Sequence, residues 1–249
     1  MRRTDTAILP NGLSAIGMRK AFGARVAVAG VDVHVRAGEI VGLLGVSGSG
    51  KSTIFNMITG LVRPDAGSFH IGGRDVTEAT VDARARMGIG YVPQSPVLFP
   101  KLTVEDNLLI AVEASGVEPE QGQAKLDAVL RAFGIAETRR SRLATLSGGQ
   151  RRWVEIAFAM CGRPRYLLLD EPFAALDPII SAQLSAFLVK LARLGLGILV
   201  TDHNVRHVMK SVERIYLIDN GAILASGPAG SVIDHHGVRA SFLGENFRL

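Results

Sequence analysis

The fold expected for this chain follows from one glycine-rich segment, Gly45-Val46-Ser47-Gly48-Ser49-Gly50-Lys51-Ser52. It matches G-x-x-x-x-G-K-[ST], follows an apolar run at 39–44 and precedes helically spaced apolar residues at 54, 57, 58 and 61. Its glycines let the backbone curl so that successive N–H groups point inward, and the next helix adds its positive N-terminal end. We therefore expect a phosphate-binding loop in which Lys51 reaches the phosphates and Ser52 ligates Mg²⁺. A glycine-rich turn with an incidental lysine is the alternative, and the flanking strand and helix argue against it.

Composition limits the class of protein without choosing its function. The chain has 249 residues, of which 47% are hydrophobic, enough for a sizeable core in one α/β domain or two small ones. The net charge of +5 suits a nucleotide, a nucleic acid or an anionic membrane surface equally well. The single cysteine, Cys161, excludes an internal disulfide and lies on the apolar side of a helical pattern, so we expect it in the core. Neither a signal peptide nor an apolar run of about 18 residues is visible, so we expect that the protein itself is neither secreted nor membrane-spanning.

Short alternating segments from residue 15 to 35 predict antiparallel strands ahead of the phosphate loop. Phe22 lies at a turn within them, where an adenine ring could stack on it, although an ordinary core aromatic explains it equally well. A strand at 89–92 is expected to end just before Gln94. Helical patterns then run from Thr103 and from Pro119 to Gly134, which predicts a helical insertion.

The insertion ends in Leu146-Ser147-Gly148-Gly149-Gln150, followed at once by another helix. A serine with two glycines at a helix start presents free N–H groups and a helix dipole, as the first loop does. In isolation the same residues would more often form a plain N-cap turn. With a phosphate loop elsewhere in the chain, they indicate a second anion site.

Two further strands are expected to end in polar residues at the same edge of a sheet. The apolar run 166–169 leads into Asp170 and Glu171, and the run 197–201 leads into Asp202 and His203. Asp170 is placed to hold Mg²⁺, and Glu171, on the other side of the pleat, to polarise a water for attack on a γ-phosphate. A neutral His203 could donate to a phosphate oxygen. Two solvated carboxylates capping a turn are the simpler alternative.

Taken in order, GVSGSGKS, Gln94, LSGGQ, YLLLDEP, Ala175-Leu176-Asp177 and His203 resemble the ATP-binding cassette (ABC) ATPases over nearly the whole chain. The resemblance implies an α/β P-loop NTPase of ABC type, with a mixed central sheet, an antiparallel β subdomain and a helical subdomain. Residues 1–249 would form a single ABC ATPase domain, with a RecA-like core at 1–94 and 163–249 and the helical subdomain at about 95–162. Phe22 departs from the tyrosine common in the family, a change that preserves stacking.

The resemblance also implies an ATPase that works as a head-to-tail dimer, with ATP between the phosphate loop of one subunit and Ser147 to Gln150 of the other. Asp177 would then lie at the subunit boundary. The implied catalytic residues are Glu171, His203, Lys51 and Gln94, and the implied Mg²⁺ ligands are Ser52, Gln94 and Asp170. The implied ATP-binding residues are Phe22, Gly45, Val46, Ser47, Gly48, Ser49, Gly50, Lys51, Ser52, Thr53, Gln94, Ser147, Gly148, Gly149, Gln150 and Asp177.

Within the family, RRWVEIAFAM, DEPFAALDPI, TDHNVR and the closing LGENFRL resemble the ATPases of lipopolysaccharide export. Val46-Ser47 and Gln150 depart from that group, whereas GIGYVPQ and LFPKLTVEDNLL resemble ATPases that import branched-chain amino acids or urea. A third class acts on nucleic acid, but its members carry a long coiled coil or two cassettes, and this chain shows neither. We therefore expect lipopolysaccharide export at the cytoplasmic face of the inner membrane, with no nucleic-acid partner.

The segment 95–102, directly after Gln94, is unusually apolar for a loop, with Val97, Leu98 and Phe99 adjacent. Loops belong on the surface, where an apolar cluster indicates a partner, although a loop tucked into the core is the alternative. The resemblance implies that a short helix of a transmembrane permease subunit docks here. We therefore expect Phe99 to anchor that helix.

Overall fold

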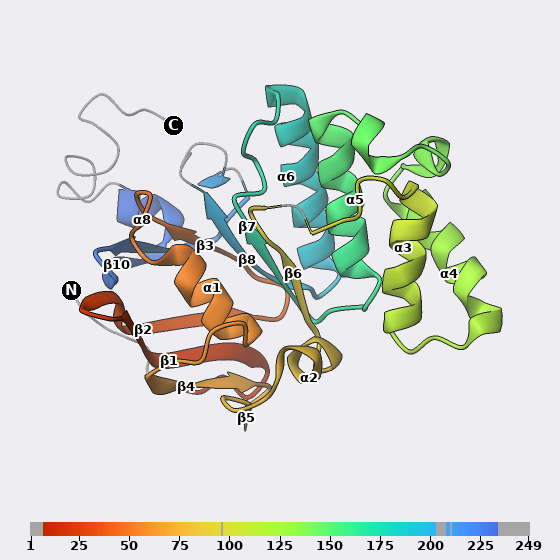
Figure 1. The fold of residues 1–249 in the computed structure, drawn as a ribbon. Coiled ribbons are helices and arrows are strands. Elements are labelled where there is room, and N and C mark those ends of the chain that lie inside the picture. Colours follow the sequence, from red (N-terminus) through yellow and green to blue (C-terminus); the bar gives the residue numbers. More distant parts are fainter. Residues whose placement is uncertain (1–6, 96, 203–207, 210, 234–249) are drawn as a thin grey trace.

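The computed structural model describes residues 7–95, 97–202, 208–209 and 211–233. Two sheets and a set of helices make up this part of the chain (Figure 1). The central sheet has the order β10-β9-β3-β8-β7-β6. Its strands are β3 (Ile40–Leu44), β6 (Ile89–Val92), β7 (Tyr166–Asp170), β8 (Gly197–Asp202), β9 (Arg214–Asp219) and β10 (Ala222–Pro228). All neighbouring pairs are parallel except β9 and β10, which form an antiparallel hairpin.

The second sheet is antiparallel and has the order β2-β1-β4-β5. Its strands are β1 (Gly12–Phe22), β2 (Arg25–Arg36), β4 (Ala66–Ile71) and β5 (Arg74–Asp75). The antiparallel strands expected from residues 15–35 are therefore present, and Phe22 is the last residue of β1. Helix α1 (Lys51–Thr59) lies between this sheet and the central sheet, and α2 (Val81–Arg86) connects β5 to β6.

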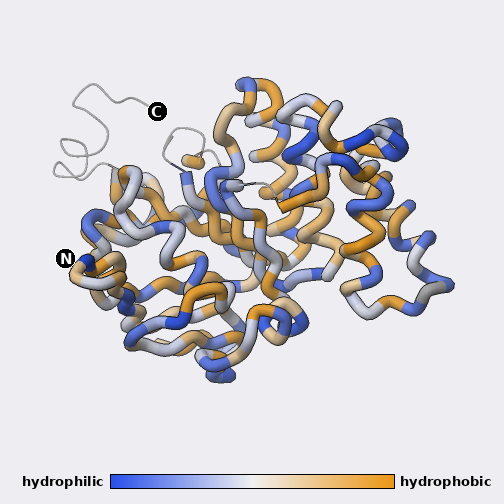
Figure 2. Tube along the Cα trace, in the orientation of Figure 1, coloured by the Kyte–Doolittle hydropathy of each residue, from blue (hydrophilic) through white to orange (hydrophobic). Residues whose placement is uncertain are grey.

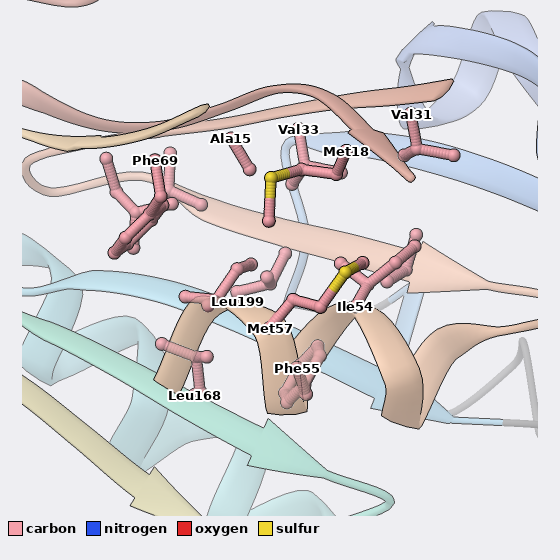
Figure 3. Packing of buried hydrophobic residues seen from close by; sticks show 14 of the residues in the cluster. Ala15, Met18, Val31, Val33, Ile54, Phe55, Met57, Phe69, Leu168 and Leu199 are labelled. Atoms are coloured by element: carbon pink, nitrogen blue, oxygen red, sulfur yellow. The ribbon is translucent and has the colours of Figure 1, made fainter. Parts of the chain in front are cut away.

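The central strands read as continuous apolar runs because both of their faces are buried. Leu168 and Leu199 point to the side that holds α1 and the antiparallel sheet, where they join a cluster with Met18 and Phe55 (Figure 3). Leu167 and Ile198 point to the opposite side, which α6 (Pro178–Arg193) and α8 (Ala229–Ile233) cover. In Figure 2, which colours the chain by hydropathy, hydrophobic residues accordingly follow the central strands in the interior of the protein.

Three further helices and two short 3₁₀ turns of the described chain form a third cluster, beside β6 and α6 (Figure 1). They are α3 (Val104–Ala114), α4 (Pro119–Ala132), the short 3₁₀ turns η1 (Ala136–Thr138) and η2 (Leu143–Thr145), and α5 (Gly148–Met160). Thr103 and Asp106 close a capping box at the start of α3, and Gly134, with φ of 65°, follows the end of α4. Cys161 is buried in this cluster, which confirms it as a core residue, and burial raises the pKa of its thiol to about 11. We propose these helices as the helical subdomain.

Among the described residues, no helix combines the length and the apolar character needed to cross a membrane.

Candidate nucleotide site

The glycine-rich segment connects β3 to α1, as a phosphate-binding loop requires. Gly48 and Gly50 adopt φ of 77° and 111°, which L side chains rarely do, and Gly50 caps the N-terminus of α1. A β-carbon on Gly45 would overlap the carbonyl oxygen of Ile218, so this glycine permits a close approach of β9. The loop therefore curls at the C-terminal edge of the central sheet, with the first turn of α1 behind it.

Lys51 is the first residue of α1, and its side chain folds back over the loop. Its Nζ donates to the carbonyl oxygens of Gly45 (2.8 Å) and Val46 (2.9 Å). Burial lowers the pKa of the ammonium, while the negative charges of Glu171, Asp170 and Asp202 act in the opposite direction. The cation is thus held by groups that a phosphate oxygen could replace.

Asp170 ends β7, and Thr201 of the neighbouring strand β8 holds its carboxylate. The Thr201 hydroxyl donates to Asp170 Oδ1 at 2.5 Å and accepts from the backbone N–H of Glu171 at 3.0 Å. Glu171 lies beyond the strand with φ of 50°, so a left-handed backbone, and not the pleat expected from the sequence, sets the direction of its side chain. Such a conformation in a non-glycine residue costs about 1–3 kcal/mol and is concentrated at functional sites.

Gln94 follows β6 and reaches the same edge of the sheet. Its Nε2 donates to Glu171 Oε2 at 2.8 Å, which joins two residues 77 positions apart in the chain. Strands β6 and β7 are parallel, with Val92 opposite Leu169, so the residues that follow them meet.

A hollow of about 310 Å³ at this edge collects many of the residues predicted for the site. Phe22 forms one side with half of its surface exposed, and Lys20 Nζ lies 5.6 Å from the centre of its ring. The predicted residues that line the hollow are Phe22, Ser47, Gly48, Gly50, Lys51, Ser52, Thr53, Gln94 and Glu171.

Other predicted residues lie elsewhere. Ser147 caps α5, and its hydroxyl accepts from the N–H of Gln150 while its own N–H donates to the side chain of Gln150. Asp177 caps α6 by accepting from the N–H groups of Ile179 and Ile180, both at 2.9 Å. Neither lines the hollow, and both are exposed. The prediction for His203 falls outside the described residues.

Arg25 and Thr201 also belong to this region although no role was predicted for them, and Asp202 was predicted only to lie at this edge of the sheet. Arg25 lines the hollow, and its Nη2 lies 3.4 Å from the carbonyl oxygen of Gly48. Its position just after the Phe22-Gly23 turn is the sequence feature that could have indicated it. Thr201 and Asp202 are both buried at the end of β8, where a polar pair closing an apolar run was the signal.

The expected Mg²⁺ ligands offer hard oxygen atoms, which this ion prefers: the Ser52 hydroxyl, the Gln94 amide oxygen and the Asp170 carboxylate. Asp170 is buried, whereas Ser52 and Gln94 line the hollow. Among the described residues there is no cluster of three or more His, Cys, Asp or Glu side chains able to hold a metal. Three oxygen donors from the protein leave the other positions of an octahedral Mg²⁺ to water and phosphate oxygens, as this ion prefers.

Comparison with known families agrees with this geometry. The family model described as "ABC transporter" matches residues 28–174, more than half of the chain. A probable ABC transporter ATP-binding protein of Azorhizobium caulinodans is 44% identical over 98% of this chain and 86% of its own length. The lipopolysaccharide export system ATP-binding protein LptB of Acidithiobacillus ferridurans is 40% identical over 95% and 98% of the two chains.

Solved structures show the same fold. A nucleotide-free ATP-binding cassette of an ABC transporter superposes with a TM-score of 0.85 at 26% identity, covering 94% of this chain and 99% of its own. A dimeric cassette bound to ADP and phosphate superposes with a TM-score of 0.78 at 26% identity, covering 87% and 98%. The protein belongs to the ABC transporter family. Within it, the chain is an ATP-binding subunit of the ATP-hydrolysing type.

Proposed function

We propose that this protein hydrolyses ATP at the hollow beside the phosphate loop, with Glu171 as the group that polarises the attacking water. The hydrogen bond from Gln94 to Glu171 carries this proposal, because it leaves the carboxylate held at the mouth of the loop that binds phosphates. Lys51 and the loop N–H groups hold the β- and γ-phosphates. The Phe22 ring is exposed at the edge of the hollow, where an adenine can stack on it.

Ser52, Gln94 and Asp170 would hold the Mg²⁺ of the nucleotide. When bound, the ion neutralises charge that develops on the phosphates. The chain's own contribution is to keep the ligands in place, and Thr201 does so for Asp170 by a short hydrogen bond. His203 is proposed as a further phosphate contact, on its sequence position after β8.

The signature residues Ser147, Gly148, Gly149 and Gln150 are proposed to complete the site from a second copy of this chain. They start a helix, they are exposed or half-buried, and they do not line the hollow of their own subunit. A γ-phosphate between the two helix N-termini would use both anion sites at once. Asp177, exposed at the start of α6, is proposed to lie at the boundary between the subunits.

Phe99 is proposed to anchor a transmembrane permease subunit. Leu98 is buried among the helices at 6% exposure, whereas Phe99 is 51% exposed and Val97 62%. Asn107, fully buried in α3, accepts from the N–H of Phe99 at 2.8 Å and donates to its carbonyl oxygen at 3.0 Å. An exposed aromatic side chain on a backbone held in this way loses little conformational freedom on binding.

For the cargo, we propose lipopolysaccharide or a related lipid, exported by a complex on the cytoplasmic face of the inner membrane. The support is the group of relatives named LptB and the resemblance of residues 151–160 and 201–206 to that group. Import of branched-chain amino acids or urea is the competing assignment, supported by the resemblance of residues 88–94 and 98–109.

The test is to tag the protein in its native host, purify its complex from membranes and identify the permease subunits. Lipid-export permeases that also make hydrolysis respond to lipopolysaccharide in proteoliposomes are expected. Importer permeases would contradict the cargo while leaving the ATPase intact. Hydrolysis stimulated by nucleic acid, without any permease, would contradict the transport function itself.

A further inference from the structure

The turn between β9 and β10 is a two-residue hairpin loop formed by Asn220 and Gly221. Both residues have positive φ, 45° and 76°, and Asp219 pairs with Ala222 across the turn. Positive φ at both central residues is the mark of a type I′ turn, for which Asn-Gly is the preferred sequence. The turn is therefore encoded by its own two residues.

Gly221 bridges two parts of the molecule that are far from it in sequence. Its N–H donates to the carbonyl oxygen of Ser49 in the phosphate loop at 2.9 Å. Its own carbonyl oxygen accepts from the N–H of Ala29, in the antiparallel sheet, at 2.8 Å. One residue of the hairpin thus ties the phosphate loop to β2.

The contact leaves no room for side chains. A β-carbon on Gly221 would lie 2.7 Å from the carbonyl oxygen of Ala27, and one on Gly50 would lie 2.6 Å from the same oxygen. Real β-carbons do not approach an oxygen so closely, so both positions must be glycine if the three backbones are to meet. The glycine of the turn therefore serves the hairpin and the close contact together.

The bond to Ser49 also orients a donor of the phosphate loop. In a planar trans peptide, the carbonyl of one residue and the N–H of the next point in opposite directions. Because the Ser49 carbonyl is drawn toward Gly221, the N–H of Gly50 is turned to the other side. This N–H therefore points away from the hairpin, and Gly50 itself lines the nucleotide hollow.

We propose that Gly221 is a positioning residue for nucleotide binding, which holds the phosphate loop in its binding shape before ATP arrives. A loop already in its bound shape loses less freedom on binding, so the turn raises affinity without touching the nucleotide. The inference rests on ATP binding at this loop and adds a residue about 170 positions from it.

The test compares Gly221→Ala with Gly116→Ala. Gly116, in the connection between α3 and α4, has φ of 73°, close to that of Gly221, but a β-carbon there would meet no atom within 4 Å. Both variants suffer the strain of a left-handed alanine, and only the first disturbs the phosphate loop. We expect Gly221→Ala to raise the Kd for a fluorescent ATP analogue and the KM for ATP about 3- to 10-fold, the effect of one lost hydrogen bond, with a smaller change in kcat. An unchanged Kd in folded Gly221→Ala would overturn the proposal.

Amide hydrogen exchange of the unmodified protein decides the matter should Gly221→Ala fail to fold. If the turn supports nucleotide binding, the nucleotide must in return stabilise the turn. Saturating Mg·ADP is therefore expected to slow exchange in peptides that cover residues 219–222 and residue 29. Protection of residues 45–52 alone would contradict the positioning role of Gly221 but would still support ATP binding. If no peptide is protected and the analogue does not bind, both ATP binding at this loop and the positioning role of Gly221 are wrong.

Discussion

The side chains of Gln94 and Glu171 meet across the ends of two parallel strands, 2.8 Å apart from amide nitrogen to carboxylate oxygen. Gln94 thereby holds one oxygen of the carboxylate, and it also begins the segment that leads to Phe99 five residues later. A partner that moves this segment would act on the proposed catalytic carboxylate through this hydrogen bond.

Replacing Glu171 by glutamine keeps the size of the side chain but removes its ability to take a proton. ATP hydrolysis is expected to fall about 10²- to 10⁴-fold, the range for a lost general base, while Mg·ATP still binds. Phosphate release gives the rate, and size-exclusion chromatography with ATP shows whether the variant is trapped as a dimer. Glu113→Gln, at an exposed carboxylate in α3, is the matched control and should turn over normally. Near-normal hydrolysis by Glu171→Gln would contradict the assignment.

Mixing two inactive variants tests whether a site is shared between subunits. Lys51→Ala damages the phosphate loop and Ser147→Arg damages the signature segment, so a mixed dimer has one intact site and one doubly damaged site. An equal mixture should recover up to about a quarter of the wild-type sites if dimers form at random. Differently tagged subunits confirm that mixed dimers are present. Activity no higher than that of either variant alone, with mixed dimers shown, would contradict shared sites that work independently.

A negative charge at Phe99 should block binding of the permease without unfolding the protein. The side chain is half exposed, so Phe99→Asp is expected to keep the thermal midpoint and the basal ATPase rate of the isolated subunit. The amount of membrane subunits that co-purifies should fall at least about tenfold, as expected for an aromatic anchor that becomes buried in the interface. Val81→Asp changes an apolar residue of similar exposure on α2 and should retain the partners. A variant that unfolds would identify Phe99 as a core residue, and undiminished partner binding would remove it as the anchor.

The ion pair between Glu39 and Arg214 should make the stability of the fold depend on pH. Arg214 contacts both carboxylate oxygens of Glu39, at 2.7 Å and 3.0 Å, and joins β9 to the residue before β3. Burial raises the pKa of Glu39, but bonds from Arg214 and from the N–H of Arg36, together with their charges, outweigh it, so the folded pKa is lowered. The pair therefore contributes stability at neutral pH, and this is lost as the pH falls through the folded pKa of Glu39.

Urea unfolding of Glu39→Gln measures this contribution. We expect a loss of about 3 kcal/mol in the free energy of unfolding at pH 7, because Arg214 keeps its burial and loses its partner charge. The difference from wild type should shrink in acid, as the native carboxyl becomes protonated. Asp82→Asn, at an exposed carboxylate that pairs with Arg86, should change the free energy of unfolding little, both at pH 7 and in acid. A difference independent of pH would show that packing, and not charge, explains the loss.

Much of the architecture follows from local patterns in the sequence. The strand, loop and helix around Lys51, the capping box at Thr103 and the helix start at Ser147 all lie where the sequence predicts them. These features depend on neighbours within four residues, on backbone preferences and on the burial of both faces of a strand. A sequence pattern records such requirements directly.

The contacts between distant segments become visible only in the folded chain. The bond from Gln94 to Glu171, the support of Asp170 by Thr201 and the presence of Arg25 in the hollow depend on which strands lie side by side. The same holds for Leu98, which is buried while its neighbour Phe99 is exposed, because the helices that receive Leu98 come later in the chain. Such contacts arise when the strand ends are brought to one edge of the sheet, and no local spacing in the sequence encodes them.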